Sequence, residues 1–303
     1  MKIIFAGTPE VAIPTLDALN ARHEVVGVIT RPDAPLGRKR ILTPSSVAQR
    51  ATQLGLPIHK TSRFTSETSD FISQSGAELG VVVAYGALIP ESDLASVTHG
   101  WINLHFSQLP QWRGAAPLQR TIMSGATEVG LSIFTLVAEL DAGPVLESMS
   151  VPLGATETAG EALTRLASVG SHEVVRVVEA LESATATSTE QVGQVSFAGK
   201  LTANDGRLEP KDTARSAFNI FRGVTPEPGA WIDSTSGRVK VLVCAMAEDG
   251  SVSSGTLLAS PDSVLIGFTD GALSLITVQP AGKVVMPAQD WARGLQRESW
   301  RFS

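Results

Sequence analysis

The sequence predicts an α/β domain with a mostly parallel sheet, followed by a smaller β-barrel domain. Its 303 residues exceed what one compact domain usually needs and suffice for two cores. Up to about residue 183, short apolar runs alternate with amphipathic stretches, as in β/α units. Beyond about residue 202, short strand-like runs are separated by Gly, Ser, Asp and Pro. We therefore predict a Rossmann-like domain over residues 1–183, a linker over 184–202, and an OB-like barrel over 203–303.

The first domain is predicted to hold strands that are buried on both faces. Val- and Ile-rich runs with helical stretches between them are typical of a parallel sheet covered by helices. The strand predictions are residues 2–5, 24–29, 79–84 and 101–105. Helices are predicted after several of these strands, for example over 9–20 and 44–54. Residues 129–137 and 145–151 have no helix between them, which predicts an antiparallel edge, and one long helix follows over 158–181.

The second domain is predicted to begin after a segment without a packing pattern. Residues 182–194 are rich in Ser, Thr and Ala and lack an apolar period, which is typical of a linker. A helix is expected over 213–221. The barrel strands are expected at 231–232, 239–245, 255–258, 264–268 and 273–278.

Composition indicates an ordinary globular protein with an acidic balance. The hydrophobic share is 43%, the charged share is 18% and the pI is near 5.4. We see no export leader and no apolar run long enough for a bilayer, and the single Cys244 excludes an internal disulfide. We expect a cytoplasmic monomer without a membrane partner. Because the net charge is negative, affinity for phosphate would have to come from local basic clusters.

The loop after the first predicted strand argues against a bound dinucleotide. Gly7-Thr8-Pro9-Glu10 has one glycine where a dinucleotide-binding fingerprint has three. A strand-to-helix turn with Thr8 as the helix N-cap is the favoured interpretation over a phosphate site.

The strongest functional pattern is NLHFSQLPQWRGAAP, from Asn103 to Pro117. Alternation along a strand places Asn103 and His105 on one face, near the edge of the sheet where open α/β folds bind ligands. Alone, this pair could simply cap a strand end. The rigid loop that follows, with its prolines and small residues, favours a ligand site.

A second pattern is Glu139-Leu140-Asp141-Ala142-Gly143-Pro144, between two predicted strands. Alone it is an Asp-led turn. Considered with His105, Asp141 offers a carboxylate that would orient an imidazole and stabilise its protonated form.

Asn103, His105 and Asp141 together resemble the catalytic triplet of the folate-dependent formyltransferase family. Residues 107–110, Ser-Gln-Leu-Pro, resemble that family's SLLP segment, and residues 81–86 resemble its VVVAYG segment. The resemblance implies 10-formyltetrahydrofolate as cosubstrate and no metal. It also implies a set of folate-binding residues, namely Val83, Tyr85, Gly86, Ser107, Gln108, Leu109, Pro110, Leu140 and Gly143.

Further segments resemble the branch of the family that acts on methionyl-tRNA. These are KIIFAGTPEVA near the start, QWRGAAPLQ at residues 111–119 and VQPAGK at residues 278–283. Residues 31–40 resemble that branch's insertion loop, which contacts the tRNA acceptor arm. The implied partner is methionyl initiator tRNA, bound by Arg38, Lys39, Arg40, Lys200 and Arg207. Other basic residues of the second domain that could contribute to a phosphate track are Arg215, Arg222, Lys240 and Lys283.

The reaction that the resemblance implies is attack of the uncharged α-amine of the methionyl ester on the formyl carbon. Asn103 would hold the formyl oxygen or the amine, protonated His105 would stabilise the oxyanion, and Asp141 would support the imidazolium. Gln108 and Pro144 depart from the family pattern, which predicts a folate affinity that differs from that of other family members.

Three alternatives stay open. A formyltransferase for a UDP-amino sugar would share the catalytic core, and a folate-using hydrolase would replace the amine by water. A tRNA-binding protein with a degenerate core is the third, and the intact triplet argues against it.

Overall fold

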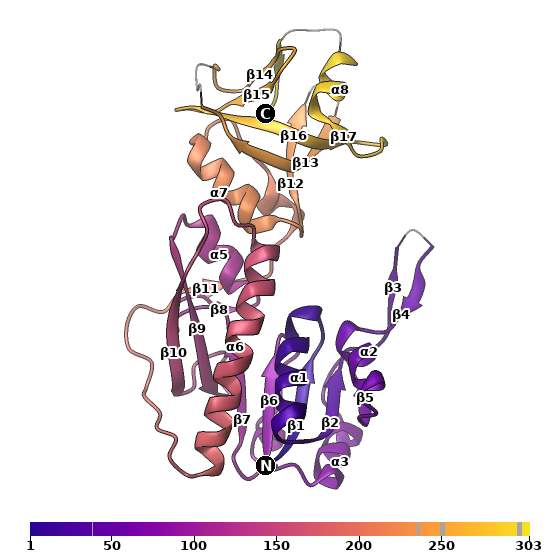
Figure 1. Cartoon of the computed structure of the whole chain (residues 1–303), viewed down its shortest axis with the longest axis vertical. Coiled ribbons are helices and arrows are strands. Elements are labelled where there is room, and N and C mark those ends of the chain that lie inside the picture. Colours follow the sequence, from indigo (N-terminus) through magenta and orange to yellow (C-terminus); the bar gives the residue numbers. More distant parts are fainter. Residues whose placement is uncertain (38, 235–236, 249–251, 296–298) are drawn as a thin grey trace. The chain divides into compact units, whose positions relative to one another are not determined.

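The computed structural model describes residues 1–37, 39–234, 237–248, 252–295 and 299–303 (Figure 1). The chain divides into two compact units, and each unit draws on separate stretches of sequence. The first unit consists of Met1–Pro117, Val129–Val151 and Leu163–Ala198. The second consists of Leu118–Glu128, Pro152–Ala162 and Gly199–Ser303.

The first unit is built on a seven-stranded sheet with the order β10-β9-β7-β6-β1-β2-β5. Its strands are β1 (Lys2–Gly7), β2 (Glu24–Thr30), β5 (Ile58–Lys60), β6 (Leu79–Val83), β7 (Trp101–His105), β9 (Glu128–Thr135) and β10 (Val145–Pro152). Neighbours from β7 to β5 pair in parallel, whereas β7 and β9 are antiparallel. The predicted Rossmann-like, mostly parallel sheet with an antiparallel edge is therefore confirmed.

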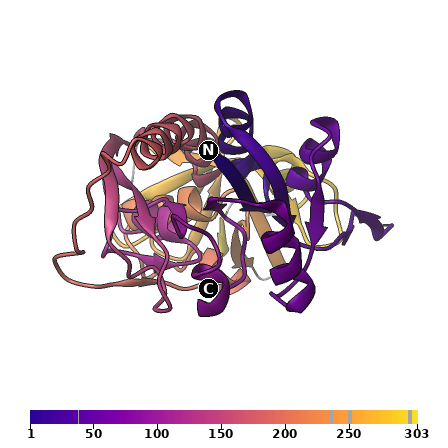
Figure 2. The same cartoon turned by 90° about the horizontal axis from the view of Figure 1, so that it is seen from below.

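Helices cover both faces of this sheet. They are η1 (Glu10–Ala12), α1 (Ile13–Arg22), α2 (Ser46–Gln53), α3 (Ser66–Ser75), α4 (Glu91–Leu94) and α6 (Ala159–Glu182). In Figure 2, α1 and α6 lie on the same side of the sheet. On β2, Gly27 leaves the space that Phe71 of α3 fills, because a Cβ there would lie 2.9 Å from the Phe71 ring.

The turn after β1 differs from its prediction. Pro9, and not Thr8, is the N-cap of the first helical turn. The Thr8 hydroxyl donates instead to the Tyr85 carbonyl over 2.9 Å, so the predicted Thr8 cap is wrong. The hydroxyl joins the loops that follow β1 and β6, the two strands between which the chain order of the parallel sheet reverses.

Two small pairings complete the first unit. β3 (Ala34–Leu36) and β4 (Ile41–Thr43) form an antiparallel hairpin that extends away from the sheet in Figure 1. β8 (Arg113–Gly114) pairs in parallel with β11 (Phe197–Ala198), which brings the end of the predicted linker onto the loop that follows β7.

The second unit contains the antiparallel sheet β12-β13-β16-β15-β14-β18, with β17 beside β16. Its strands are β12 (Ala230–Ser234), β13 (Gly237–Met246), β14 (Thr256–Ala259), β15 (Val264–Gly267), β16 (Ala272–Pro280), β17 (Met286–Pro287) and β18 (Ser299–Arg301). Its helices are α5 (Pro117–Met123), η2 (Ala203–Gly206), α7 (Ala214–Val224) and α8 (Ala288–Arg293). After β18, the Ser303 amide donates to the Asp233 carbonyl of β12 over 2.9 Å, so the two edges meet as a barrel requires.

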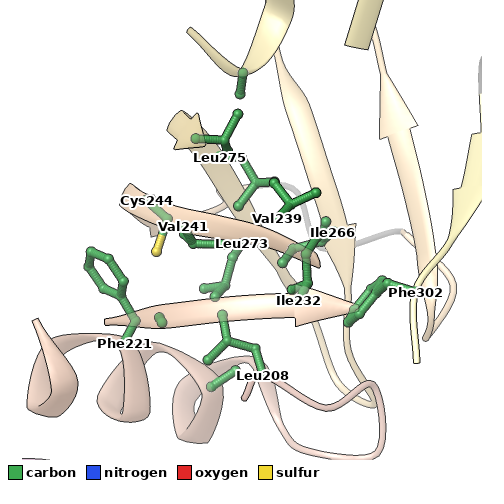
Figure 3. Packing of buried hydrophobic residues seen from close by; sticks show 14 of the residues in the cluster. Leu208, Phe221, Ile232, Val239, Val241, Cys244, Ile266, Leu273, Leu275 and Phe302 are labelled. Carbon is green, nitrogen blue, oxygen red and sulfur yellow. The ribbon is translucent and has the colours of Figure 1, made fainter. Parts of the chain in front are cut away.

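One apolar core holds this barrel together (Figure 3). The Ala, Phe and Val positions of α7 recur at helical spacing, and Phe221 is 4% exposed where this face packs on the sheet. Ile232, Val241 and Leu273 face it from the strands and are buried. Burying each such side chain contributes about 1.5–3 kcal/mol. No helix in the described ranges is long and apolar enough to cross a membrane.

Candidate active site

The site is built on the end of β7, where the sheet changes from parallel to antiparallel pairing. Along β7, Leu104 points toward α6, whose Gly170 leaves room for it. Because side chains alternate along a strand, Asn103 and His105 lie on the opposite face. The structure thus places the two predicted residues on one face of one strand.

His105 is held by a backbone carbonyl of the loop that follows it. Its Nε2 lies 2.9 Å from the Trp112 carbonyl oxygen, and its side chain is 5% exposed. Because a carbonyl can only accept, Nε2 carries the proton, and Nδ1 of the neutral ring has a free lone pair. Nδ1 lies 3.9 Å from Asp141 Oδ2.

Asp141 reaches His105 from the loop between β9 and β10. Its Oδ2 accepts a hydrogen bond of 2.7 Å from the Gly114 amide. Its φ of 48° lies in the left-handed region, which Asp tolerates better than most residues. The carboxylate is therefore fixed by the same loop whose Trp112 carbonyl orients His105.

The electrostatics of this pair favour a neutral ring in the resting protein. Burial lowers the pKa of His105, while Asp141 and the hydrogen bond to Trp112 raise it by a smaller amount. Desolvation thus outweighs the nearby carboxylate. A neutral ring can take up a proton at Nδ1, beside Asp141.

Asn103 completes the site with an unsatisfied polar atom. Its Oδ1 is buried and has no hydrogen-bond partner within the described part of the chain. Leaving a buried acceptor unpaired costs about 1–3 kcal/mol, so its presence beside a buried His/Asp pair indicates a polar ligand. As the amide is assigned, a donor such as an amine would fit Oδ1, and a flipped amide would present its N–H to a carbonyl oxygen.

Hydrogen bonds to β9 hold the loop that follows β7. Ser132 of β9 donates to the Ser107 carbonyl over 2.8 Å and accepts from the Leu109 amide over 3.2 Å. The Ser107 hydroxyl is used within the loop, where it donates to the Gln111 carbonyl over 2.6 Å. Leu109 and Pro110 are buried, whereas Gln108 is exposed. Of these four predicted folate residues, Gln108 therefore presents its side chain most openly.

The predicted folate residues at the end of β6 and just after it differ in exposure. Val83 and Tyr85 are buried, and the Tyr85 hydroxyl donates to the Thr61 carbonyl over 3.2 Å. Gly86 is exposed, has a φ of 83° and has nothing within 4 Å of the position of a Cβ, so a ligand could approach it closely, while its carbonyl accepts from Arg31 over 3.3 Å. Of these three residues, Gly86 alone therefore presents its backbone to solvent.

The remaining two predicted folate residues flank Asp141. Leu140 is 45% exposed. Gly143 is packed so closely that a Cβ would lie 1.8 Å from the Thr135 carbonyl oxygen. Gly143 therefore fixes the Asp141 loop against β9, and Leu140 presents apolar surface beside the carboxylate.

Comparison with known proteins matches both parts of the chain. A model described as formyl transferase matches residues 1–178, and one described as formyl transferase, C-terminal domain, matches residues 200–296. The chain belongs to the formyl transferase family.

Proteins named methionyl-tRNA formyltransferase are similar to this formyl transferase over nearly its whole length. One from Paenarthrobacter aurescens is 45% identical and one from Clavibacter sepedonicus is 47% identical, and each match covers 97% of both chains. The solved structure of a methionyl-tRNA formyltransferase from Clostridium thermocellum matches with a TM-score of 0.60 at 16% identity, covering 82% of this chain and 94% of that one. At that identity the structural match supports the fold alone.

The basic residues of this formyl transferase occupy different environments. Lys39 and Arg40 are exposed on the β3–β4 hairpin, and Arg38 lies outside the described residues. Lys200 is exposed. Arg207 is half-buried over the Trp231 ring, with its guanidinium 5.6 Å from the ring centroid.

One suggested phosphate contact is wrong. Arg222 is 5% exposed, and its guanidinium donates to the Gly154 and Glu157 carbonyls over 2.8 and 2.9 Å. It therefore holds the second unit together rather than facing a phosphate. The periodicity of α7 places position 222 on the packed face of the helix, a signal that its charge obscured.

Several residues around the triplet were not singled out from the sequence. Arg113 is buried in the loop that supplies the Trp112 carbonyl and the Gly114 amide, and Gln191 bonds to it. Ser132 could have been found, because it is a polar residue within the apolar run of β9. Nothing in the Ser/Thr-rich sequence around Gln191 marks it. Among the described residues, no group of three or more His, Cys, Asp or Glu side chains could hold a metal ion.

Proposed function

We propose that this formyl transferase transfers the formyl group of 10-formyltetrahydrofolate to the α-amino group of methionyl initiator tRNA, giving N-formylmethionyl-tRNA for translation initiation. The observation that carries this proposal is the buried His105 at the end of β7, which lies beside Asp141 of the β9–β10 loop and on the same face as the unpaired Asn103 oxygen. This set suits acyl transfer to an amine. It needs neither a metal nor a covalent enzyme intermediate.

Asn103 positions the attacking group. An N–H of the uncharged methionyl amine donates to Asn103 Oδ1, which supplies the missing partner of that buried oxygen. In the flipped orientation the same amide would hold the formyl oxygen through its N–H group. Either contact aligns nucleophile and carbonyl, and alignment is a large part of the rate gain in such reactions.

His105 accepts the proton released during the reaction, and Asp141 stabilises the charge that this produces. Attack on the formyl carbon produces an oxyanion and an ammonium group, and neutral His105 can accept a proton at Nδ1. The resulting imidazolium lies beside Asp141, which stabilises it, and its charge offsets the oxyanion. Return of the proton to the departing folate nitrogen completes the transfer.

The folate cosubstrate would contact the loops after β6, β7 and β9. The exposed backbone of Gly86 would bind the edge of the heterocycle, and the buried Val83 and Tyr85 would hold the loop that carries it. Gln108, Leu109 and Leu140 would contact its faces, and Ser107, Pro110 and Gly143 would shape the loops.

The acceptor tRNA would bind both units through phosphate contacts. Lys39 and Arg40 are exposed on the β3–β4 hairpin, Arg38 precedes them in the sequence, and Lys200 and Arg207 are basic positions of the second unit. We assign catalysis to residues 1–183, the connection to 184–202 and tRNA binding to 203–303. The protein would act as a monomer in the cytoplasm, where charged tRNA is made.

The test is transfer of labelled formyl from 10-formyltetrahydrofolate to a panel of acceptors by the purified protein. The panel holds methionyl initiator tRNA, methionyl elongator tRNA, UDP-amino sugars and water. Transfer confined to the initiator tRNA is the expected result. Label in a sugar or in free formate would instead support the other enzyme classes, and folate binding without turnover would support a tRNA-binding protein with an inactive core.

A further inference from the structure

We propose that Gln191, in the segment after α6, is a positioning residue that holds Asp141 in reach of His105. This inference rests on the proposed function of the site and adds a residue to it. The segment was assigned to a linker because it lacks apolar residues in a packing pattern. Hydrogen bonds hold it instead.

The Gln191 side chain joins the two loops that carry the site. Its Nε2 donates to the Asp141 and Gly143 carbonyls over 2.8 and 2.9 Å. Its Oε1 accepts from Arg113 Nε and Nη2 over 3.1 and 2.8 Å. The remaining Arg113 nitrogen, Nη1, donates to Glu139 over 2.8 Å.

The orientation of this amide follows from its partners. Two carbonyl oxygens can only accept, and a guanidinium can only donate. The Gln191 amide therefore makes four hydrogen bonds, two through each polar atom, all with groups of the two loops. An amide with this many partners is fixed in position, because rotation would place like atoms against each other at every contact.

The two loops that Gln191 joins are the ones that orient the catalytic pair. Arg113 lies between Trp112, whose carbonyl holds His105, and Gly114, whose amide holds Asp141. The backbone that Gln191 binds on the other side belongs to Asp141 itself. The hydrogen bonds of Gln191 to both loops therefore set the separation of His105 Nδ1 and Asp141 Oδ2.

Backbone hydrogen bonds on either side of Gln191 hold it between the two loops. Thr189 exchanges two hydrogen bonds with Val145 at the start of β10, of 2.8 and 2.9 Å. Farther along, Ser196 accepts from the Arg113 amide over 2.9 Å, and β11 pairs with β8. Gln191 lies between these two attachments, so the segment crosses from the Asp141 loop to the Arg113 loop.

The proposal is tested by the electrostatic coupling between His105 and Asp141. NMR titration of the His105 ring in the protein alone gives its pKa, and the His105→Asn variant assigns the signal. Asp141 is the charged group that acts on this ring among the described residues, so Asp141→Asn lowers the pKa. The size of that drop is measured in three backgrounds: wild type, Gln191→Met and Gln194→Met.

Gln191→Met keeps the length of the side chain and removes all four hydrogen bonds without adding charge. Gln194 is exposed on the same segment and supplies the matched control. We expect Gln191→Met to reduce the Asp141-dependent drop by at least about half, while Gln194→Met leaves it unchanged. Gln191→Ala is the second variant, and thermal unfolding checks that each protein is folded.

Turnover supplies the second readout. We expect Gln191→Met and Gln191→Ala to lower kcat about 10- to 100-fold, because small displacements of catalytic groups are costly, with KM for tRNA within about twofold of wild type. An unchanged coupling, or a reduced coupling with wild-type kcat, would overturn the proposal. If the wild-type protein transfers no formyl group, the proposed function fails, and the titration still decides whether Gln191 holds Asp141.

Discussion

Asp141 Oδ2 accepts a 2.7 Å hydrogen bond from the Gly114 amide and lies 3.9 Å from His105 Nδ1. The carboxylate is therefore bound to the backbone in the resting protein and stands just outside hydrogen-bond distance of the ring. Protonation of His105 at Nδ1 adds a charged donor facing this oxygen. The pair is arranged so that its attraction becomes strong only when the reaction delivers a proton.

The pKa of His105 should fall further when Asp141 loses its charge. Burial already lowers this pKa and Asp141 opposes the effect, so Asp141→Asn removes a stabilising charge from the imidazolium. The ring then stays neutral to lower pH than in wild type. The linked loss of stability still begins where the unfolded chain protonates, near the ordinary histidine pKa of about 6.5, but it continues to lower pH in the variant. NMR titration of the ring measures the change. An unchanged or raised pKa would show that the carboxylate does not act on His105.

Gly143→Ala should destabilise the first unit. The added methyl group would lie 1.8 Å from the Thr135 carbonyl oxygen, so the Asp141 loop must move away from β9. We expect a loss of about 1–3 kcal/mol in the free energy of unfolding, from denaturant titration. Gly199→Ala is the matched control, because a Cβ at Gly199 meets nothing within 4 Å. Equal stability of the two variants would contradict the packing described for Gly143.

Arg222→Met should destabilise the second unit. The change leaves the Gly154 and Glu157 carbonyls without their guanidinium donor. We expect a loss of about 1–3 kcal/mol, visible as a lower thermal midpoint. Arg215→Met, on the exposed side of the same helix, should leave the midpoint near that of wild type. A midpoint for Arg222→Met as high as that of its control would mean that these hydrogen bonds contribute little.

Removal of the charges at Lys39 and Arg40 should weaken tRNA binding without slowing the chemical step. Both side chains are exposed on the β3–β4 hairpin, and the proposed contacts are to phosphate. The double alanine variant should raise KM for tRNA and flatten the dependence of log Kd on log salt, by roughly 0.7–0.9 for each lost phosphate contact. Arg176→Ala, at an exposed position on α6, is the control. An unchanged salt slope would remove the hairpin from the tRNA interface.

The sheet and the catalytic strand were predictable because local pattern decides them. The runs that became β1, β6 and β7 are short, apolar and bounded by turn residues, and the 24-residue α6 has a clear helical period. α3 was not among the helices named from the sequence, because Ser, Thr and Asp fill most of its length and its few apolar side chains define no clear face.

The support of the site was not predictable in the same way. Gln191 acts through four hydrogen bonds to residues about 50 and 80 positions away in the chain. No local period or turn pattern encodes such contacts. The resting charge of His105 likewise depends on desolvation by the folded protein, which the order of residues in β7 does not reveal.

The most direct test of the central claim is the single-turnover rate of formyl transfer to methionyl initiator tRNA, with protein in excess over tRNA. We compare wild type with Asn103→Ala, His105→Ala and Asp141→Asn, after circular dichroism has shown that each variant is folded. The account predicts rapid transfer by wild type, and a rate lowered at least about 10²- to 10³-fold in the His105 and Asp141 variants, with a slower rate in the Asn103 variant as well. Transfer at the wild-type rate by a folded His105→Ala protein would contradict the assignment of this strand end as the catalytic site.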